Sequence, residues 1–166
     1  MHFDLKPISV ESIPEALGKV ERYRLLNEPG LAESICLDIL TIAPDHQPAA
    51  IALLLARTEQ FGRGVAPEAA REVLSRIQGD YERAYYEGII WERMAHGQLR
   101  HGRLGAAAAA YHELRKAMEC YERAEAVRPP GNDDAILRWN TCVRIIMRNR
   151  EVRPLPHEEF QPILSE

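Results

Sequence analysis

Long apolar runs, secretory signals and paired cysteines are all missing from this sequence. The longest strongly apolar stretch is AAIALLLA at 49–56, far short of the roughly 20 residues that cross a bilayer as a helix. The opening stretch, MHFDLKPISVES, lacks the basic start and the apolar core of a secretory signal. Three widely spaced cysteines, Cys36, Cys120 and Cys142, do not make a disulfide framework. We therefore expect a soluble, cytoplasmic protein.

An excess of positive charge and the common catalytic motifs are also missing. The formal net charge of −4 gives no overall attraction to nucleic acid or to an anionic membrane. The chain has no CxxC, no HExxH and no Glu-x-x-His pair, and its glycine-containing stretches at 62–64 and 101–105 lack the lysine of a phosphate-binding loop. We therefore expect no enzymatic activity, no metal or other cofactor, and no nucleic-acid or membrane partner.

Helices are what the sequence does indicate. Aromatic residues make up only 7% of the chain, so alanine, leucine and isoleucine supply the apolar surface, which suits closely packed helices. Proline and glycine divide the chain into seven expected helices, at about 13–27, 31–43, 48–61, 67–78, 80–101, 104–128 and 132–149. Because the connections are short, successive helices should be antiparallel neighbours. The sequence predicts an all-α domain over 13–149, preceded by a segment at 1–12.

The last stretch, residues 150–166, contains three prolines and is expected to be an extended tail rather than a regular helix. Phe160, Ile163 and Leu164 give this tail three apolar anchors, which are suited to a helical groove.

The fifth and sixth expected helices form an unusually long hairpin. A turn at HGRLG (101–105) gives helices of about 22 and 25 residues, or about 33–38 Å each at 1.5 Å per residue. The sixth helix carries two apolar stripes, which lets it pack on two neighbours at once. One stripe is Leu104, Ala107, Tyr111, Leu114, Met118 and Tyr121, and the other is Ala110, Ala117, Cys120, Ala124 and Val127.

An internal repeat connects distant parts of the chain. Residues 32–57 align with residues 117–142 without a gap, so that Ala32 matches Ala117 and Pro44 matches Pro129. The matched positions are those that a helix–turn–helix unit needs: a small residue where helices touch, a larger one a turn later, and a proline after the helix end.

Residues 117–129, AMECYERAEAVRP, resemble the second helix of a tetratricopeptide repeat. In that family this helix carries an alanine, a large residue, a second alanine and a terminal proline, the positions held here by Ala117, Tyr121, Ala124 and Pro129. AESICLDILTIAP and APEAAREVLSRI resemble the same helix more distantly. The resemblance covers about 13–149 and implies a right-handed superhelical stack of three degenerate repeats with a C-terminal capping helix.

The resemblance also implies a function. Arrays of this family expose a concave face made by the first helix of each hairpin, here about 13–27, 46–61 and 80–101, and that face takes a peptide or protein segment. The candidate lining residues are Tyr23, Arg57, Tyr85, Glu92 and Arg93. We therefore expect a scaffold or adaptor for protein–protein interaction.

Two other functions stay open. A helical-bundle metal protein or enzyme could use His96, His101 and His112, which gather near the turn of the long hairpin. Alternatively, the long hairpin at 80–128 or the tail could pair with a second copy, which would make the chain a homo-oligomerisation module.

Overall fold

The computed structural model describes residues 3–102 and 104–154, and this part of the chain is all-α, as predicted. A short 3-10 turn at Val10–Ser12 precedes seven helices and no strand is present among the described residues. The helices are α1 (Ile13–Leu25), α2 (Pro29–Ile42), α3 (Gln47–Thr58), α4 (Pro67–Leu74), α5 (Asp80–His101), α6 (Ala106–Ala126) and α7 (Asp134–Arg148).

Local signals explain where most helices begin. Pro29, Pro48 and Pro67 lie in the first turn of α2, α3 and α4, where the missing amide hydrogen of proline costs nothing. Gly79 and Gly105 precede α5 and α6 with positive φ angles of 88° and 80°, which glycine adopts without strain. These residues act on their own neighbours, so the expected boundaries agree closely with the observed ones.

The end of α4 is an exception, because α4 was expected to reach residue 78 and stops at Leu74. The following residues bind α3 instead. The Gln47 side chain accepts a hydrogen bond from the Gln78 amide (2.8 Å) and donates one to the Arg76 carbonyl (3.3 Å). A contact across about thirty residues therefore ends this helix early.

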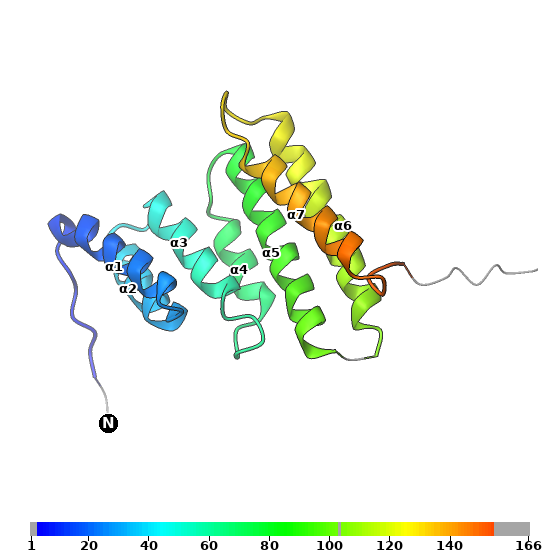
Figure 1. Cartoon of the computed structure of the whole chain (residues 1–166). Coiled ribbons are helices and arrows are strands. Elements are labelled where there is room, and N and C mark those ends of the chain that lie inside the picture. The colour runs from blue at the N-terminus through cyan, green and yellow to red at the C-terminus, as the bar shows by residue number, and fades with distance from the viewer. Residues whose placement is uncertain (1–2, 103, 155–166) are drawn as a thin grey trace, which may run out of the picture.

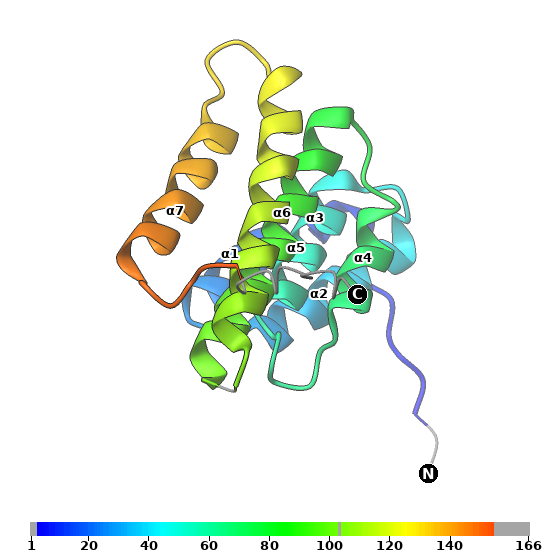
Figure 2. The same ribbon diagram turned by 90° about the vertical axis from the view of Figure 1, so that its right-hand side faces the viewer.

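The helices form an elongated stack in chain order (Figure 1). Each helix packs on the next, and α1 also contacts α3, which in turn contacts α5. The first helices of the three hairpins therefore lie together, and α7 packs along α6 (Figure 2). The third hairpin is long, as predicted: α5 and α6 have 22 and 21 residues, whereas α3 and α4 have 12 and 8.

Two apolar cores run through the stack, one under α1–α4 with Ile90 of α5 and one under α5–α7. The repeat positions in both are fully buried: Ala32, Cys36, Ile39, Ala117, Tyr121 and Ala124. Tyr121 fits over Gly88, where a Cβ atom would meet the tyrosine ring at 2.5 Å. Alanine and glycine thus let helix backbones approach closely around a few large side chains.

The start of the expected tail belongs to the second core. Val152 is 3% exposed and packs with that core, and its amide donates a hydrogen bond to the Asn149 carbonyl (2.9 Å). The expected anchors Phe160, Ile163 and Leu164 lie outside the described residues.

Candidate functional site

Two of the residues expected to line a concave face lie in the first half of the stack. Tyr23 is half-buried against the first core. Arg57 forms an ion pair with Glu33 of α2 (Nε–Oε1 2.9 Å) and donates a second hydrogen bond to the Ala69 carbonyl of α4 (2.8 Å). The guanidinium of Arg57 is thus used to join α3 to both of its neighbours.

Glu92 belongs to a buried polar cluster that joins the last three helices. The whole residue is 2% exposed. Oε2 accepts a hydrogen bond from the hydroxyl of Tyr121 on α6 (2.6 Å), and Oε1 accepts one from Nη1 of Arg138 on α7 (3.1 Å). Tyr85 packs against Tyr121 with ring centroids 5.9 Å apart. Arg93, the next residue on α5, is half-buried and has no ion pair among the described residues.

The electrostatics of this cluster follow from burial and pairing. Burial raises the pKa of Tyr121, and the nearby charge of Glu92 raises it further. Burial on its own would lower the pKa of Arg138, but the carboxylate of Glu92 and the neighbouring tyrosines outweigh it, so that this pKa is raised. The tyrosine therefore stays protonated, the arginine stays charged, and each oxygen of Glu92 has one donor. Such a set of contacts fixes the positions of three helices.

The histidines and cysteines are dispersed. His96 is half-buried, and burial lowers its pKa, whereas His112 is exposed on α6 and His101 is the last residue of α5. No three histidine, cysteine or acidic side chains among the described residues are grouped closely enough to hold a metal ion. All three cysteines are buried, and burial raises the pKa of Cys36 and Cys142 to about 12 and that of Cys120 to about 11.

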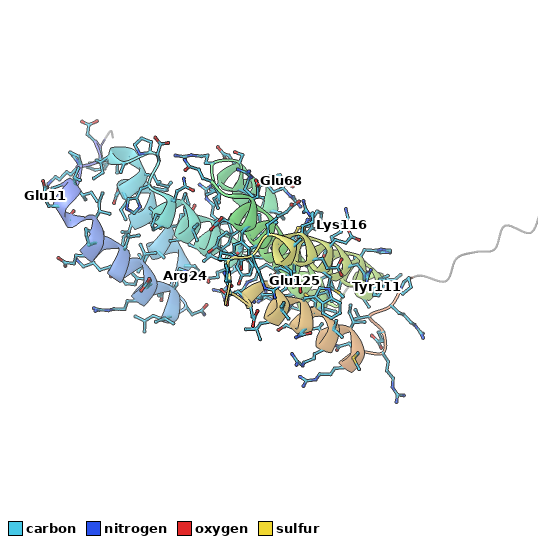
Figure 3. All side chains as sticks on the ribbon, turned by 90° about the horizontal axis from the view of Figure 1, so that it is seen from above. Glu11, Arg24, Glu68, Tyr111, Lys116 and Glu125 are labelled. Atoms are coloured by element: carbon cyan, nitrogen blue, oxygen red, sulfur yellow. The ribbon has the colours of Figure 1, made fainter. Side chains whose placement is uncertain are left out.

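Two pockets lie where the short helix α4 meets the long hairpin α5–α6, and we call the surface that carries them the groove. With eight residues, α4 covers only the middle of α5, and a pocket remains at each of its ends. Between the pockets, Arg71 of α4 and Lys116 of α6 both stand over the ring of Trp91 on α5, at 4.8 and 4.5 Å from its centroid. These cation–π contacts join α4 and α6 to α5. Figure 3 labels Glu68 on α4 and Lys116 on α6, the two helices that carry the cations.

The first pocket, which we call the Glu113 pocket, has a volume of about 250 Å³. Its lining residues come from the loop before α4 and from α5 and α6: Phe61, Gly62, Val65, Pro67, Met94, Gly97, Gln98 and Glu113. Gln98 donates a long hydrogen bond to Oε1 of Glu113 (3.4 Å), while Oε2 is buried and has no hydrogen-bond partner among the described residues. Burial raises the pKa of this carboxyl.

The second pocket, which we call the arginine pocket, has a volume of about 560 Å³. It lies beyond the carboxyl end of α4 and is lined by Arg71, Leu74, Ser75, Asp80, Arg83, Ala84, Glu87, Arg123 and Val127. Arg83 pairs with Asp80 (2.5 Å) and Arg123 with Glu87 (2.7 Å). These pairs are largely exposed to water and are therefore weak, so their arginines remain able to meet an acidic group.

Sequence reasoning did not identify this groove, although two signals for it were present. The unequal lengths of the second and third hairpins imply an uncovered surface. Glu113 also falls between Ala110 and Ala117 on the second apolar stripe of α6, at the spacing of that stripe. A carboxylate on an otherwise apolar stripe needs a partner, and that position could have been singled out.

Comparison with protein-family models, with curated proteins and with solved structures finds no match for this chain. Among the described residues, none of the helices is both long enough and apolar enough to span a membrane.

Proposed function

We propose that this protein is a helical scaffold that binds a segment of another protein in the groove between α4 and the hairpin α5–α6. The observation that carries the proposal is the groove itself. The Glu113 pocket, with mainly apolar walls and one carboxylate, lies at one end of it, and the arginine pocket lies at the other. Gln98 and Glu87, which mark the two pockets on α5, are eleven residues apart. That spacing is about 16 Å along a helix, or roughly five residues of extended chain.

A tetratricopeptide-like arrangement is part of the same proposal. It is supported by the contacts among α1, α3 and α5 and by the burial of the repeat positions in α2 and α6. Stacks of this kind present an extended surface built from rigid helices, which suits the binding of protein segments. The interior ion pair of Arg57 and the burial of Glu92 favour the groove beside α4 over the concave face as the binding surface.

Site-specific photo-crosslinking tests the proposal. Benzoylphenylalanine replaces Ser75, which is exposed and lines the arginine pocket, and in a control protein it replaces Ser34, which is exposed on α2 outside the groove. In lysate we expect the Ser75 probe to yield a discrete crosslinked protein that the Ser34 probe does not yield. The purified partner should then bind the wild-type chain, and Ser75→Trp should weaken that binding. Identical crosslinks from both probes would contradict the proposal.

A further inference from the structure

The last helix of the stack, α7, carries an apolar side that none of the described helices fully covers. Each earlier helix is followed by another that packs on it, whereas no helix follows α7 among the described residues. Trp139, Val143 and Ile146 recur along one side of α7 at helical spacing, and each stays half-buried. Trp139 also donates a hydrogen bond from Nε1 to Glu122 of α6 (3.0 Å), so this side of α7 borders α6.

Tyr111 of α6 completes this surface. Tyr111 is half-buried, packs with the same core as the α7 residues, and lies on the side of α6 that carries Glu122. Figure 2 shows α6 and α7 side by side at the end of the stack. We call the surface the end face and define it by four residues: Tyr111, Trp139, Val143 and Ile146. Half-buried apolar side chains gathered in one place form a surface that a further apolar segment can cover.

The chain itself turns back toward the end face after α7. Val152 is 3% exposed and belongs to the second core, against which all four end-face residues pack. Its amide donates a hydrogen bond to the Asn149 carbonyl (2.9 Å), which holds the reversal. Figure 2 shows the chain, in red, crossing from the end of α7 toward α6, and the described part stops at Pro154. The residues that follow therefore start beside the end face.

Residues 155–166, LPHEEFQPILSE, have the composition that such a surface accepts. Phe160, Ile163 and Leu164 supply three large apolar side chains. Pro156 and Pro162 disfavour a helix and favour an extended backbone. An extended, proline-containing segment is a form that apolar grooves bind, so this segment can cover a face that no further described helix covers.

The charges of the segment and of the surface are opposite. Residues 155–166 contain three glutamates and no lysine or arginine. Four exposed arginines of α6, α7 and the residues just after α7 have no ion pair among the described residues: Arg115, Arg144, Arg148 and Arg150. Arg115 is four residues after Tyr111 on α6 and thus lies at the edge of the end face. An acidic segment is therefore favoured here over a basic one.

The segment can reach across the end face, and its tether favours it over other occupants. Trp139 and Ile146 are seven residues apart on α7, which is about 10 Å along the helix. Phe160 is six residues beyond Pro154, and that stretch spans up to about 20 Å when it is extended. A short tether gives the segment a local concentration in the millimolar range, so it occupies the face ahead of a second copy at lower concentration.

We propose that residues 155–166 dock on the end face of their own chain, with Phe160, Ile163 and Leu164 packing on the side chains of α6 and α7. The segment then takes the place of the helix that would follow α7. The end face shares no lining residue with either pocket of the groove, so this contact leaves the groove open for a partner.

Photo-crosslinking within the purified full chain tests the docking. Benzoylphenylalanine replaces Phe160, and after irradiation the crosslinked peptides are identified by mass spectrometry. We expect links within one chain to residues 111–115 of α6 or 139–147 of α7. Dilution of the protein should leave the yield per chain unchanged, because the reaction is intramolecular. The same probe at Phe3, which is exposed in the segment before α1, should not give these links.

NMR of the two ¹⁵N-labelled indole groups supplies a second readout. Trp139 lies on the end face, whereas Trp91 lies under the cations of α4 and α6 and serves as an internal control. Combining Phe160→Ser with Ile163→Ser should shift the Trp139 resonance and leave that of Trp91 in place. Gln161→Ser, a polar change within the same segment, should shift neither.

A charge reversal tests the electrostatic part of the docking. Arg115→Glu should lower the yield of the Phe160 crosslink severalfold, because it repels the glutamates of the segment. The matched control is Arg22→Glu, an exposed position on α1 outside the end face, which should leave the yield unchanged. An unchanged Trp91 resonance in each variant shows that the fold is intact.

Four results would overturn the proposal. Crosslinks that join two chains, with a yield that rises with protein concentration, would assign the end face to a second copy. Crosslinks to α4 would assign the segment to the groove. The absence of any link within the chain, or a Trp139 resonance that the double variant leaves unchanged, would show that the segment does not cover the end face. No partner protein enters these experiments, so their outcome is independent of the proposed scaffold function.

Discussion

Removing one hydroxyl group tests whether the polar cluster at Glu92 stabilises the long hairpin. Tyr121 is fully buried, and its hydroxyl is the donor to Oε2 of Glu92, at 2.6 Å. Nη1 of Arg138 donates a hydrogen bond to the other oxygen, Oε1, at 3.1 Å. Tyr121→Phe keeps the ring and its packing over Gly88, and leaves Oε2 buried without a partner.

The expected loss can be worked from these contacts. A hydrogen bond to a charged group contributes about 1.5–3 kcal/mol. Water can approach the cluster from the side of Arg138, whose side chain is 37% exposed, but Glu92 itself is 3% exposed at its side chain, so little solvent can replace the hydroxyl. We expect the free energy of unfolding to fall by about 2 kcal/mol. For a chain of this size that corresponds to a fall in Tm of about 4–8 °C.

Urea unfolding followed by circular dichroism measures the difference. The matched control is Tyr111→Phe on the same helix, because Tyr111 is half-buried and its hydroxyl has no hydrogen-bond partner among the described residues. The control should change stability by less than about 0.5 kcal/mol. Combining Tyr121→Phe with Glu92→Gln should give a coupling energy of about 1 kcal/mol or more. Equal stability of the two Tyr→Phe variants would refute the role assigned to the cluster.

Three further predictions concern packing, titration and thiol chemistry. Gly88→Ala should destabilise the protein by about 1–3 kcal/mol, because its Cβ would overlap the buried Tyr121 ring, whereas Gly97→Ala on the same helix should stabilise it by up to about 1 kcal/mol in thermal unfolding. Burial raises the pKa of Glu113 in the folded protein. Below the pKa of the unfolded chain, the carboxyl group is neutral in both states and does not destabilise the fold. As pH rises through the folded pKa, the buried group becomes charged and that stability is lost. Glu113→Gln should therefore stabilise the protein by about 1 kcal/mol at about pH 8 and have no effect near about pH 4 in urea titrations; a gain of equal size at both pH values would contradict the assignment. Cys36, Cys120 and Cys142 are buried, so their thiols should react with a disulfide reagent only after unfolding. Fast labelling of the native protein would show that one of these cysteines is accessible.

The helices could be predicted because their boundary signals are local. Proline in the first turn of a helix and glycine with a positive φ act on adjacent residues, so the sequence alone indicates where α3, α4 and α5 begin. The early end of α4 depends on Gln47, about thirty residues away. No local pattern contains that contact, and the arginine pocket lies just beyond the early end of α4.

The candidate site was harder to predict for a related reason. Arg57 and Glu92 are charged residues on the expected concave face of the helices that carry them. Inside a helical stack, however, such residues also serve as partners for one another, and sequence separation conceals the pairing: Arg57 meets Glu33 across 24 residues and Glu92 meets Arg138 across 46. The type of a residue and its place on a helix indicate that its charged group can lie at the concave face. Whether that group is free to bind a partner depends on whether a residue distant in the sequence already pairs with it.

The polar contacts of α5 explain why the groove has its position. Trp91 and Glu92 are consecutive on α5 and point to different neighbours, Trp91 to the cations of α4 and α6 and Glu92 to α6 and α7. Alanine-rich helix surfaces tolerate sliding, because neighbouring positions offer similar small side chains, whereas a buried pair with one partner per oxygen does not. Trp91 and Glu92 therefore fix how far α5 and α6 are shifted along each other, at one position near the middle of the hairpin. Since α4 is centred near that level and is short, the surface of the hairpin above and below it stays uncovered, and the two pockets form at the two ends of α4.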